Sequence, residues 1–237
     1  VAYLADQTTQ GRFELYTVRV NDATTGTRVS TTPVANGAIF NFAFTSDSSR
    51  VVYTGDILVD GETRLFSAPV DGSTPQVVLN GTMAAGTDVT QFEVLGNTVF
   101  FRANPDGVTN HIYRVLADGS SGRLRLTPNF DTDEEAYNFA LSPDGTRIVY
   151  RANLQDSTKI ELYSMRLDGS DNQRLTIGAS AGGNVLSFQI APDSRTVVFA
   201  GDLLIDEDID LFSRPIDGSG IFTVLEYDAT QNQAKDI

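Results

Sequence analysis

The sequence contains no cysteine and only one histidine, His111, among its 237 residues. The lack of cysteine excludes disulfide bonds and thiolate metal sites. A single imidazole excludes metal centres built from several histidines, and it gives little support to a Ser-His-Asp triad. We therefore expect a protein that is not an enzyme and that carries no cofactor, apart from the calcium site considered below.

Positive charge is also scarce, and arginine supplies almost all of it, since the only lysines are Lys159 and Lys235. The formal net charge is −14, which disfavours binding to nucleic acids and anionic membranes because phosphates attract Lys and Arg. No apolar run approaches the roughly 20 residues of a membrane-spanning helix, and the first residues do not form a signal peptide. The chain is nevertheless 41% hydrophobic, which is enough to bury a core.

What the sequence does contain is one pattern that recurs about every fifty residues. An apolar residue followed by an aromatic one marks the register, at Leu15-Tyr16, Leu65-Phe66, Ile112-Tyr113, Leu162-Tyr163 and Leu211-Phe212. Successive pairs lie 50, 47, 50 and 49 residues apart, and Asp-Gly turns follow at Asp71, Asp118, Asp168 and Asp217. A period of this length, made of short strands and turns, is typical of β-propeller blades.

The clearest copy predicts four strands, at residues 137–141, 147–151, 160–166 and 173–176. A Pro-Asp-Gly turn, a polar loop and an Asp-Gly-Ser turn separate them, so the strands form one antiparallel blade. We therefore predict an all-β fold, a single β-propeller over residues 1–237 with five blades of four-stranded antiparallel sheet. The blades are expected at residues 1–36, 37–85, 86–130, 131–180 and 181–237.

The same copy carries the motifs Ser142-Pro143-Asp144-Gly145, Arg147-Ile148-Val149-Tyr150 and Asp168-Gly169, and Pro192-Asp193 and Ser46-Asp47 repeat the first motif in part. These motifs resemble the TolB-type propeller repeat, which is related to WD-type repeats. The resemblance covers almost the whole chain and implies a propeller fold. It also implies a bacterial protein exported to the periplasm, the cell surface or the medium, because such repeats occur in periplasmic translocation proteins and in the propellers of prolyl oligopeptidase-like enzymes.

The first blade lacks the opening of the repeat. Val1-Ala2-Tyr3 aligns with Val51-Val52-Tyr53, which belongs to a second strand, so we expect this blade to lack its inner strand. Two interpretations stay open. Residues 228–237 complete the blade within a five-bladed ring, or the chain is part of a longer propeller or is completed by another copy. Because an unpaired strand edge is a template for association, self-association through the first blade is a further expectation.

One acidic loop is a candidate metal site. Residues 55–60 nearly repeat as residues 201–206, and the second copy continues with more carboxylates. Since calcium takes about six to eight oxygen ligands, we consider a calcium site formed by Asp202, Asp206, Asp208 and Asp210. The alternative is a solvated acidic loop without a metal.

Other acidic residues are candidates for a binding surface, namely Asp56, Asp60, Asp131, Asp133, Glu134 and Glu135. Focused negative potential at one mouth of the propeller would attract a basic peptide or a cation, whereas the alternative is a set of polar connectors. His111 opens a third strand, where we expect it on the surface.

The sequence therefore favours a non-enzymatic TolB-like propeller that is a scaffold for binding a protein, peptide or other ligand. The partner is expected over one mouth of the propeller or along the loops between blades, where propellers carry variable polar surface. The alternative is the substrate-gating propeller of a peptidase or a carbohydrate-active enzyme whose catalytic domain is absent from this chain.

Overall fold

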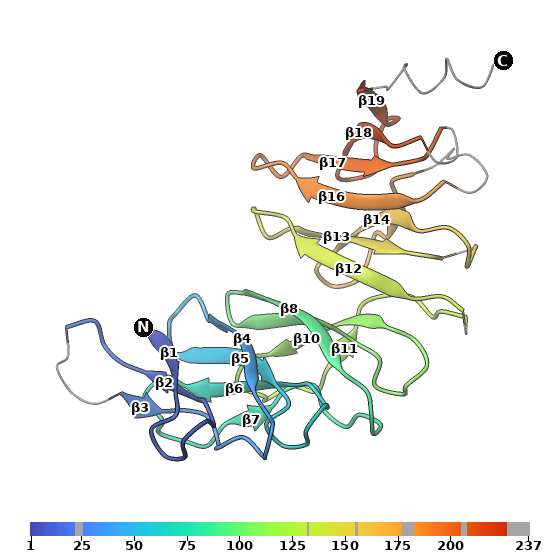
Figure 1. The fold of residues 1–237 in the computed structure, drawn as a ribbon. Coiled ribbons are helices and arrows are strands. Elements are labelled where there is room, and N and C mark those ends of the chain that lie inside the picture. Colours follow the sequence, from blue (N-terminus) through green and yellow to red (C-terminus); the bar gives the residue numbers. More distant parts are fainter. Residues whose placement is uncertain (22–25, 132, 155, 177–182, 205–207, 227–237) are drawn as a thin grey trace. The chain divides into compact units, whose positions relative to one another are not determined.

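The computed structural model describes the whole chain except residues 22–25, 132, 155, 177–182, 205–207 and 227–237. The described residues form nineteen β-strands and no helix (Figure 1). The chain divides into two compact units, Val1–Arg125 and Leu126–Ile237, and each unit has apolar clusters of its own. With no helix in its described part, the chain shows no helical segment that could cross a membrane.

The first unit contains three antiparallel sheets. The first has the order β1 (Ala2–Ala5), β2 (Glu14–Thr17) and β3 (Thr27–Arg28). The second has the order β4 (Ile39–Phe44), β5 (Arg50–Gly55), β6 (Arg64–Pro69) and β7 (Val77–Val78). The third consists of β8 (Val89–Leu95), β9 (Thr98–Ala103), β10 (His111–Leu116) and β11 (Leu124–Arg125), again paired in chain order.

The second unit contains two more sheets of this kind. One consists of β12 (Ala136–Leu141), β13 (Arg147–Ala152), β14 (Glu161–Arg166) and β15 (Gln173–Arg174). The other consists of β16 (Val185–Ile190), β17 (Thr196–Gly201), β18 (Asp210–Pro215) and β19 (Thr223–Glu226). In both sheets the strands pair with their neighbours in the chain.

Each of these sheets is an antiparallel meander, which is the architecture of a propeller blade. The predicted fold class is confirmed: the chain has an all-β propeller fold with five blades, and the first blade has three strands where the others have four. That residues 1–237 form a single propeller domain remains a prediction. The segment 228–237, which one interpretation places in the first blade, lies outside the described residues.

The aromatic residues that set the repeat stack in pairs across the second and third strands of each blade. In the second blade Tyr53 lies opposite Phe66, with ring centroids 5.3 Å apart. The other blades repeat this stack at 5.3–5.6 Å, as Tyr3 with Tyr16, Phe101 with Tyr113, Tyr150 with Tyr163 and Phe199 with Phe212. Such stacks stabilise by about 0.5–1.5 kcal/mol beyond the burial of the rings. The aromatic residues that repeat in the sequence are therefore the ones that pack in the core of each blade.

The Asp-Gly turns close the third strand onto the fourth. Asp71 accepts a hydrogen bond of 2.9 Å from the backbone N–H of Ser73, and Gly72 between them has a φ of 64°. Glycine adopts this left-handed conformation without strain, which explains the recurrent Asp-Gly pair. The turns at Asp118, Asp168 and Asp217 contain the same 2.9 Å hydrogen bond.

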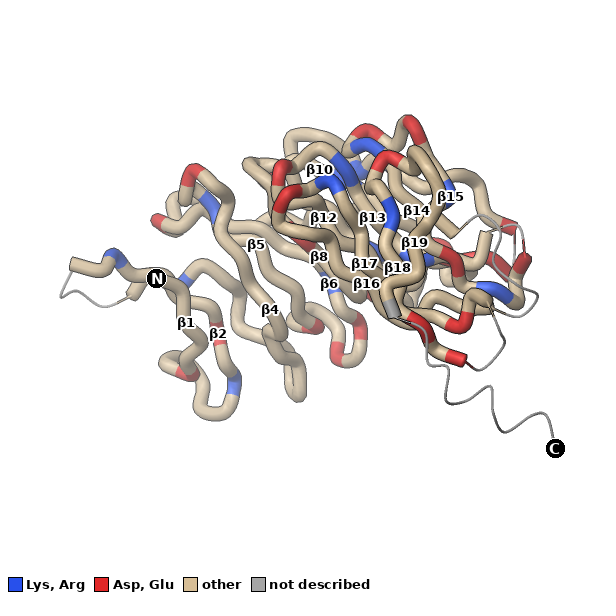
Figure 2. Tube along the Cα trace, turned by 90° about the horizontal axis from the view of Figure 1, so that it is seen from above, with Lys and Arg blue, Asp and Glu red and all other residues tan. Residues whose placement is uncertain are grey.

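Because neighbouring strands run in opposite directions, each blade has two different ends. The turn end carries the turns after the first and third strands. The loop end carries the loop after the second strand and the connection to the next blade. In both units most Asp and Glu residues lie in these turns and loops and few lie in the middle of strands (Figure 2).

Candidate functional site

Asp56, one of the predicted binding residues, lies at the loop end and is buried. Its carboxylate accepts hydrogen bonds from the backbone N–H of Ala38, at 2.6 Å, and from that of Gly61, at 3.0 Å. The first bond ties the loop to the residue before β4, and the second closes the loop itself. Asp56 is therefore engaged by the backbone of its own blade.

The same tie recurs in the other four-stranded blades. The side chain that follows the second strand accepts a hydrogen bond from the backbone N–H that precedes the first strand, as in Asn104 from Asp88, Asn153 from Glu135 and Asp202 from Asn184. The Asp or Asn at this position is thus part of how each blade is built. The sequence shows this only when the second strands of the repeats are aligned.

Asp60 lies at the exposed tip of the same loop as Asp56, where its carboxylate accepts a hydrogen bond of 3.2 Å from the side chain of Asn36. In the second unit the acidic run forms a turn. The backbone N–H of Glu134 donates to the Asp131 carbonyl, and the backbone N–H of Asp131 donates to the Glu134 carboxylate, each at 3.0 Å. The Glu134 carboxylate therefore satisfies a backbone N–H of its own turn.

Two further members of the acidic run are linked to the loop after β13. The side-chain NH₂ of Asn153 donates to the backbone carbonyl of Asp133 at 2.7 Å. The side-chain oxygen of Asn153 accepts from the backbone N–H of Glu135 at 2.6 Å. Both bonds engage the backbone of the acidic run. Whether these residues contact a partner remains a prediction.

The calcium candidates are only partly described. The Asp202 carboxylate accepts the hydrogen bond from Asn184 named above, and Asp210 lies in β18, paired with Gly201 across the ladder. Asp208 precedes that strand, while Asp206 lies outside the described residues. Among the residues that the structure describes, no group of three or more His, Asp or Glu side chains is arranged to hold a metal ion. The calcium site thus remains a prediction that depends on Asp206.

The expectation that His111 lies on the surface is wrong. His111 is 4% exposed because it is the first residue of β10, paired with Ala103 inside the sheet. Its Nε2 lies 3.0 Å from the Thr109 hydroxyl, and its ring meets the edge of Tyr113. Burial lowers the pKa of His111 to about 4, and the charge of Arg125 acts in the same direction.

Two adjoining pockets of about 650 and 690 Å³ lie at the turn end of the first unit, which the sequence did not predict. They share Arg19, Val70 and Asp71, and we call them together the turn-end groove. The first pocket is also lined by Val1, Thr17, Val18, Val20, Thr27, Phe44 and Ser48, and the second by Ser49, Arg50, Pro69, Ser73, Asn97, Leu116, Ala117 and Asp118.

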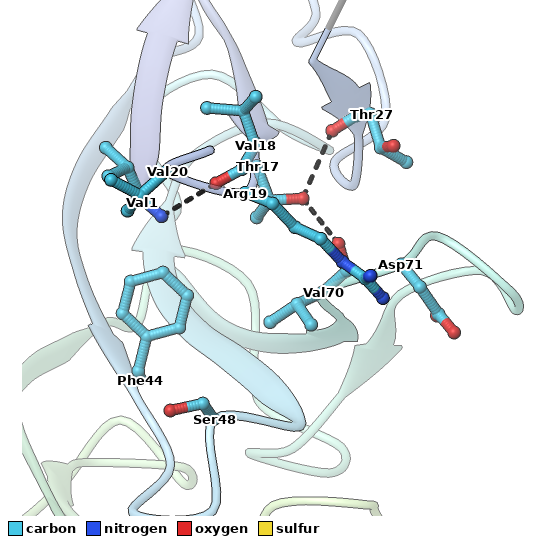
Figure 3. A pocket seen from close by; sticks show the side chains of 10 residues that line it. All are labelled: Val1, Thr17, Val18, Arg19, Val20, Thr27, Phe44, Ser48, Val70 and Asp71. Carbon is cyan, nitrogen blue, oxygen red and sulfur yellow. Dashed lines mark hydrogen bonds between the residues drawn. The ribbon is translucent and has the colours of Figure 1, made fainter. Parts of the chain in front are cut away.

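Both pockets of the groove combine apolar and polar walls. Val1, Val20 and Phe44 line the first, beside polar residues such as Thr17 and Ser48 (Figure 3). The second contains Arg50 and Asn97 beside apolar residues such as Leu116. Over the whole groove two arginines face two aspartates, so its formal charge is balanced although the chain carries −14.

Next to the groove, β4 exposes phenyl rings. Phe42 and Phe44 are each 38% exposed and share one face of the strand, whereas a β-bulge between Ile39 and Asn41 interrupts the alternation before them. In the first blade, no described strand pairs with β1 on the side away from β2. Exposed apolar rings and an unpaired strand edge are both features of protein-binding surfaces.

A smaller pocket of about 350 Å³ lies in the second unit, and Glu134 of the acidic run lines it together with Arg174. Arg174 is engaged there, since its guanidinium pairs with the buried carboxylate of Glu161. Burial raises the pKa of Glu161, although Tyr163 and Arg174 act against this rise. This pocket is therefore built around an ion pair that the blade already satisfies.

Comparisons with known proteins agree with this fold. No protein-family model and no curated protein sequence matches the chain. Among solved structures, it is similar to a TolB-type protein from Agrobacterium tumefaciens, with 16% identity, a TM-score of 0.52, and coverage of 90% of this chain and 73% of the other. It is also similar to TolB from Acinetobacter baumannii, with 18% identity, a TM-score of 0.52, and coverage of 95% and 52%.

A third similar structure is dipeptidyl peptidase 4 from Porphyromonas gingivalis, with 13% identity and a TM-score of 0.70 over 94% of this chain and 30% of the peptidase. The chain thus spans about half the length of the A. baumannii protein and less than a third of the peptidase. At these identities the likeness concerns the fold. The predicted resemblance to TolB-like propellers is confirmed at that level.

Proposed function

We propose that this TolB-like propeller chain is a binding scaffold that holds an extended peptide segment of a partner protein in the turn-end groove. The observation that carries the proposal is the pair of adjoining pockets, with volumes of about 650 and 690 Å³, each of which has both apolar and polar walls. Ligand sites combine apolar walls with a few placed polar groups in this way. A peptide that places an apolar side chain beside Phe44 and a polar group beside Arg50 fits both pockets.

The surroundings of the groove support an extended ligand. Among the described residues the edge of β1 away from β2 is unpaired, so its backbone N–H and C=O groups suit an added strand, and Phe42 and Phe44 of β4 offer apolar contacts for side chains of that strand. Stacked rings fix the core of each sheet, so the groove is preorganised on rigid elements.

The experiment is selection of peptides by display on the purified chain, followed by fluorescence anisotropy with each selected peptide. We expect Phe44→Ala to weaken binding at least about tenfold, because it removes a large apolar wall of the first pocket. Phe13→Ala is the matched control, since Phe13 is 50% exposed and does not line the groove. Failure to select any peptide, or equal effects of the two variants, would contradict the proposal.

We also propose that the protein is exported from a bacterium to the periplasm, the cell surface or the medium. The support is the likeness to TolB structures. Fractionation of native cells with an antibody against the chain tests this, and a signal confined to the cytoplasm would contradict it.

A second candidate function is the substrate-gating propeller of a peptidase whose catalytic domain is absent from this chain. The TM-score of 0.70 to the P. gingivalis peptidase favours it. The sequence of the full gene tests it. A hydrolase domain encoded beside this segment would favour the gating propeller, whereas its absence together with selected groove peptides would favour the scaffold.

A further inference from the structure

Two blades carry an arginine at the start of the second strand, and the two arginines differ in their partners. In the fourth blade the guanidinium of Arg147 is buried and donates to the Ser164 hydroxyl at 2.7 Å. It also donates to the Asp171 carboxylate at 2.8 Å and to the Asp171 carbonyl at 3.0 Å. The charge of Arg147 is therefore neutralised inside its own blade.

Arg50 occupies the same position in the second blade and keeps only the serine. Its Nε donates to the Ser67 hydroxyl at 2.8 Å, and one Nη donates to the Ser67 carbonyl at 3.4 Å, as in the fourth blade. The blade has Thr74-Pro75 after its Asp-Gly-Ser turn, where the fourth blade has Asp171. Among the residues that the structure describes, no carboxylate forms an ion pair with Arg50.

Arg50 also lines the second pocket of the turn-end groove, beside Ser49, Ser73 and Asn97. Burial lowers the pKa of Arg50, and the charge of Asp118 on the next blade acts in the opposite direction. In the fourth and fifth blades, the corresponding pair Arg147 and Asp217 likewise interact electrostatically. A partly desolvated guanidinium with one Nη that no hydrogen bond of the described residues engages, beside a cavity, is a receptor for a planar anion.

We propose that Arg50 binds a carboxylate group of the ligand, which takes the place that Asp171 holds beside Arg147. The groove favours a carboxylate over a phosphate, because Asp71 and Asp118 line the same pocket and would repel a second negative charge. The carboxylate belongs to an acidic side chain or to the C-terminus of the bound peptide. This assignment of its source rests on the proposed function.

The first test uses sodium acetate as the probe and the arginine Nε–Hε resonances as the readout. Sodium chloride at equal ionic strength, acetamide and sodium phosphate are the comparisons, and Arg50→Lys assigns the resonance. We expect a saturable shift of the Arg50 resonance with acetate only. An acetate response equal to that of chloride, or a stronger response to phosphate, would overturn the proposal.

Matched variants of the two blades give the second test. A variant with Thr74→Asp and Pro75 deleted copies the turn of the fourth blade, and we expect it to abolish the acetate response and to raise the melting temperature by about 1–3 °C. Asp171→Gly removes the carboxylate from the fourth blade and suits the φ of 53° at this position, so Arg147 should gain a response. An unchanged response at Arg50 in the first variant would refute the assignment even if the second variant failed to fold.

Peptides then identify the source of the carboxylate. Each peptide selected on the groove is compared as the free acid and the C-terminal amide, and with each Asp or Glu replaced by its amide. We expect one of these changes to weaken binding at least about tenfold, as Arg50→Ala does. Peptides that need Phe44 but ignore Arg50 would overturn this inference and leave the scaffold proposal standing. Acetate binding at Arg50 without any selected peptide would contradict the scaffold proposal and leave the assignment of Arg50 as a carboxylate site standing.

Discussion

The buried carboxylate of Glu14 offers a sharp test of how the first blade is stabilised. Glu14 is 0% exposed, and its two oxygens accept four side-chain hydrogen bonds. Thr8 and Tyr16 donate to one oxygen, at 2.5 and 2.8 Å, and Arg28 and Thr32 donate to the other. The carboxylate thus joins the loop after β1, the strand β2 and the residues around β3.

Glu14→Ala removes all four bonds, each worth about 0.5–1.5 kcal/mol, and leaves the buried Tyr16 hydroxyl without its acceptor, at a cost of about 1–3 kcal/mol. Arg28 adds little to the loss, because its side chain is 44% exposed and water solvates it. We expect a destabilisation of about 3–4 kcal/mol. Glu14→Gln keeps the shape and some of the bonds, so about 1–2 kcal/mol is expected.

The effect of Glu14→Gln should depend on pH. Burial acts to raise the pKa of Glu14, but the hydrogen bonds from its four donors outweigh it and lower the pKa to about 2. The folded-state pKa lies below the unfolded value of 4.5, so ionised Glu14 stabilises the fold above about pH 4.5 and loses this effect as the pH falls towards 2. The gap between wild type and Glu14→Gln is expected in full at about pH 7 and should shrink below about pH 4.5.

Hydrogen exchange read by mass spectrometry reports this locally, with the peptide that contains β2 as the probe. For Glu14→Ala we expect protection of β2 to fall about 10²- to 10³-fold at neutral pH. The peptide that contains β14, in the second unit, is the internal reference. Equal changes in both peptides, or a Glu14→Gln effect that persists undiminished at about pH 3, would refute the role of the hydrogen-bonded carboxylate.

Three further predictions concern the loop end of the blades. Each is measured by chemical or thermal denaturation with circular dichroism as the readout. Gly55→Ala should destabilise by about 2–4 kcal/mol, because a Cβ there would lie 2.5 Å from a backbone carbonyl, whereas Gly122→Ala, with open space, should change stability by less than about 0.5 kcal/mol. Asp56→Ala should cost about 2–3 kcal/mol through two lost backbone bonds, and Asp60→Ala less than about 0.5 kcal/mol; similar losses for both would contradict this. The calcium prediction requires a rise in melting temperature with CaCl₂ that EDTA reverses and that Asp210→Asn removes, and no rise would discard the site.

The fold was predictable because the core itself repeats. The residues that set the sequence register, such as Leu65 and Phe66, are fully buried, and the ring stacks of the second and third strands depend on them. The Asp-Gly turns were predictable for a similar reason, since the left-handed residue and the side-chain acceptor are local requirements. Even the three-stranded first blade follows from aligning Val1 with the second strands.

The environments of individual polar residues were less predictable. His111 and Asp56 look like surface residues in the sequence, yet both are buried, because strand pairing and a backbone N–H donor supply what each side chain needs. The turn-end groove escaped prediction since its walls come from turns of three different blades. Each turn alone, for instance that at Asp71, is ordinary.

In a repeat protein, equivalent positions of different blades can be compared with one another, and this comparison helps to interpret the groove. Where all four-stranded blades share a contact, such as the Asp or Asn tie to the first strand, the contact is part of how these blades are built. Where two blades share an arginine and a serine but only one has the aspartate, the difference is not required by the fold. Arg50 retains the geometry that Arg147 uses to hold a carboxylate, so the departure from the repeat, and not the repeat itself, locates the candidate binding site.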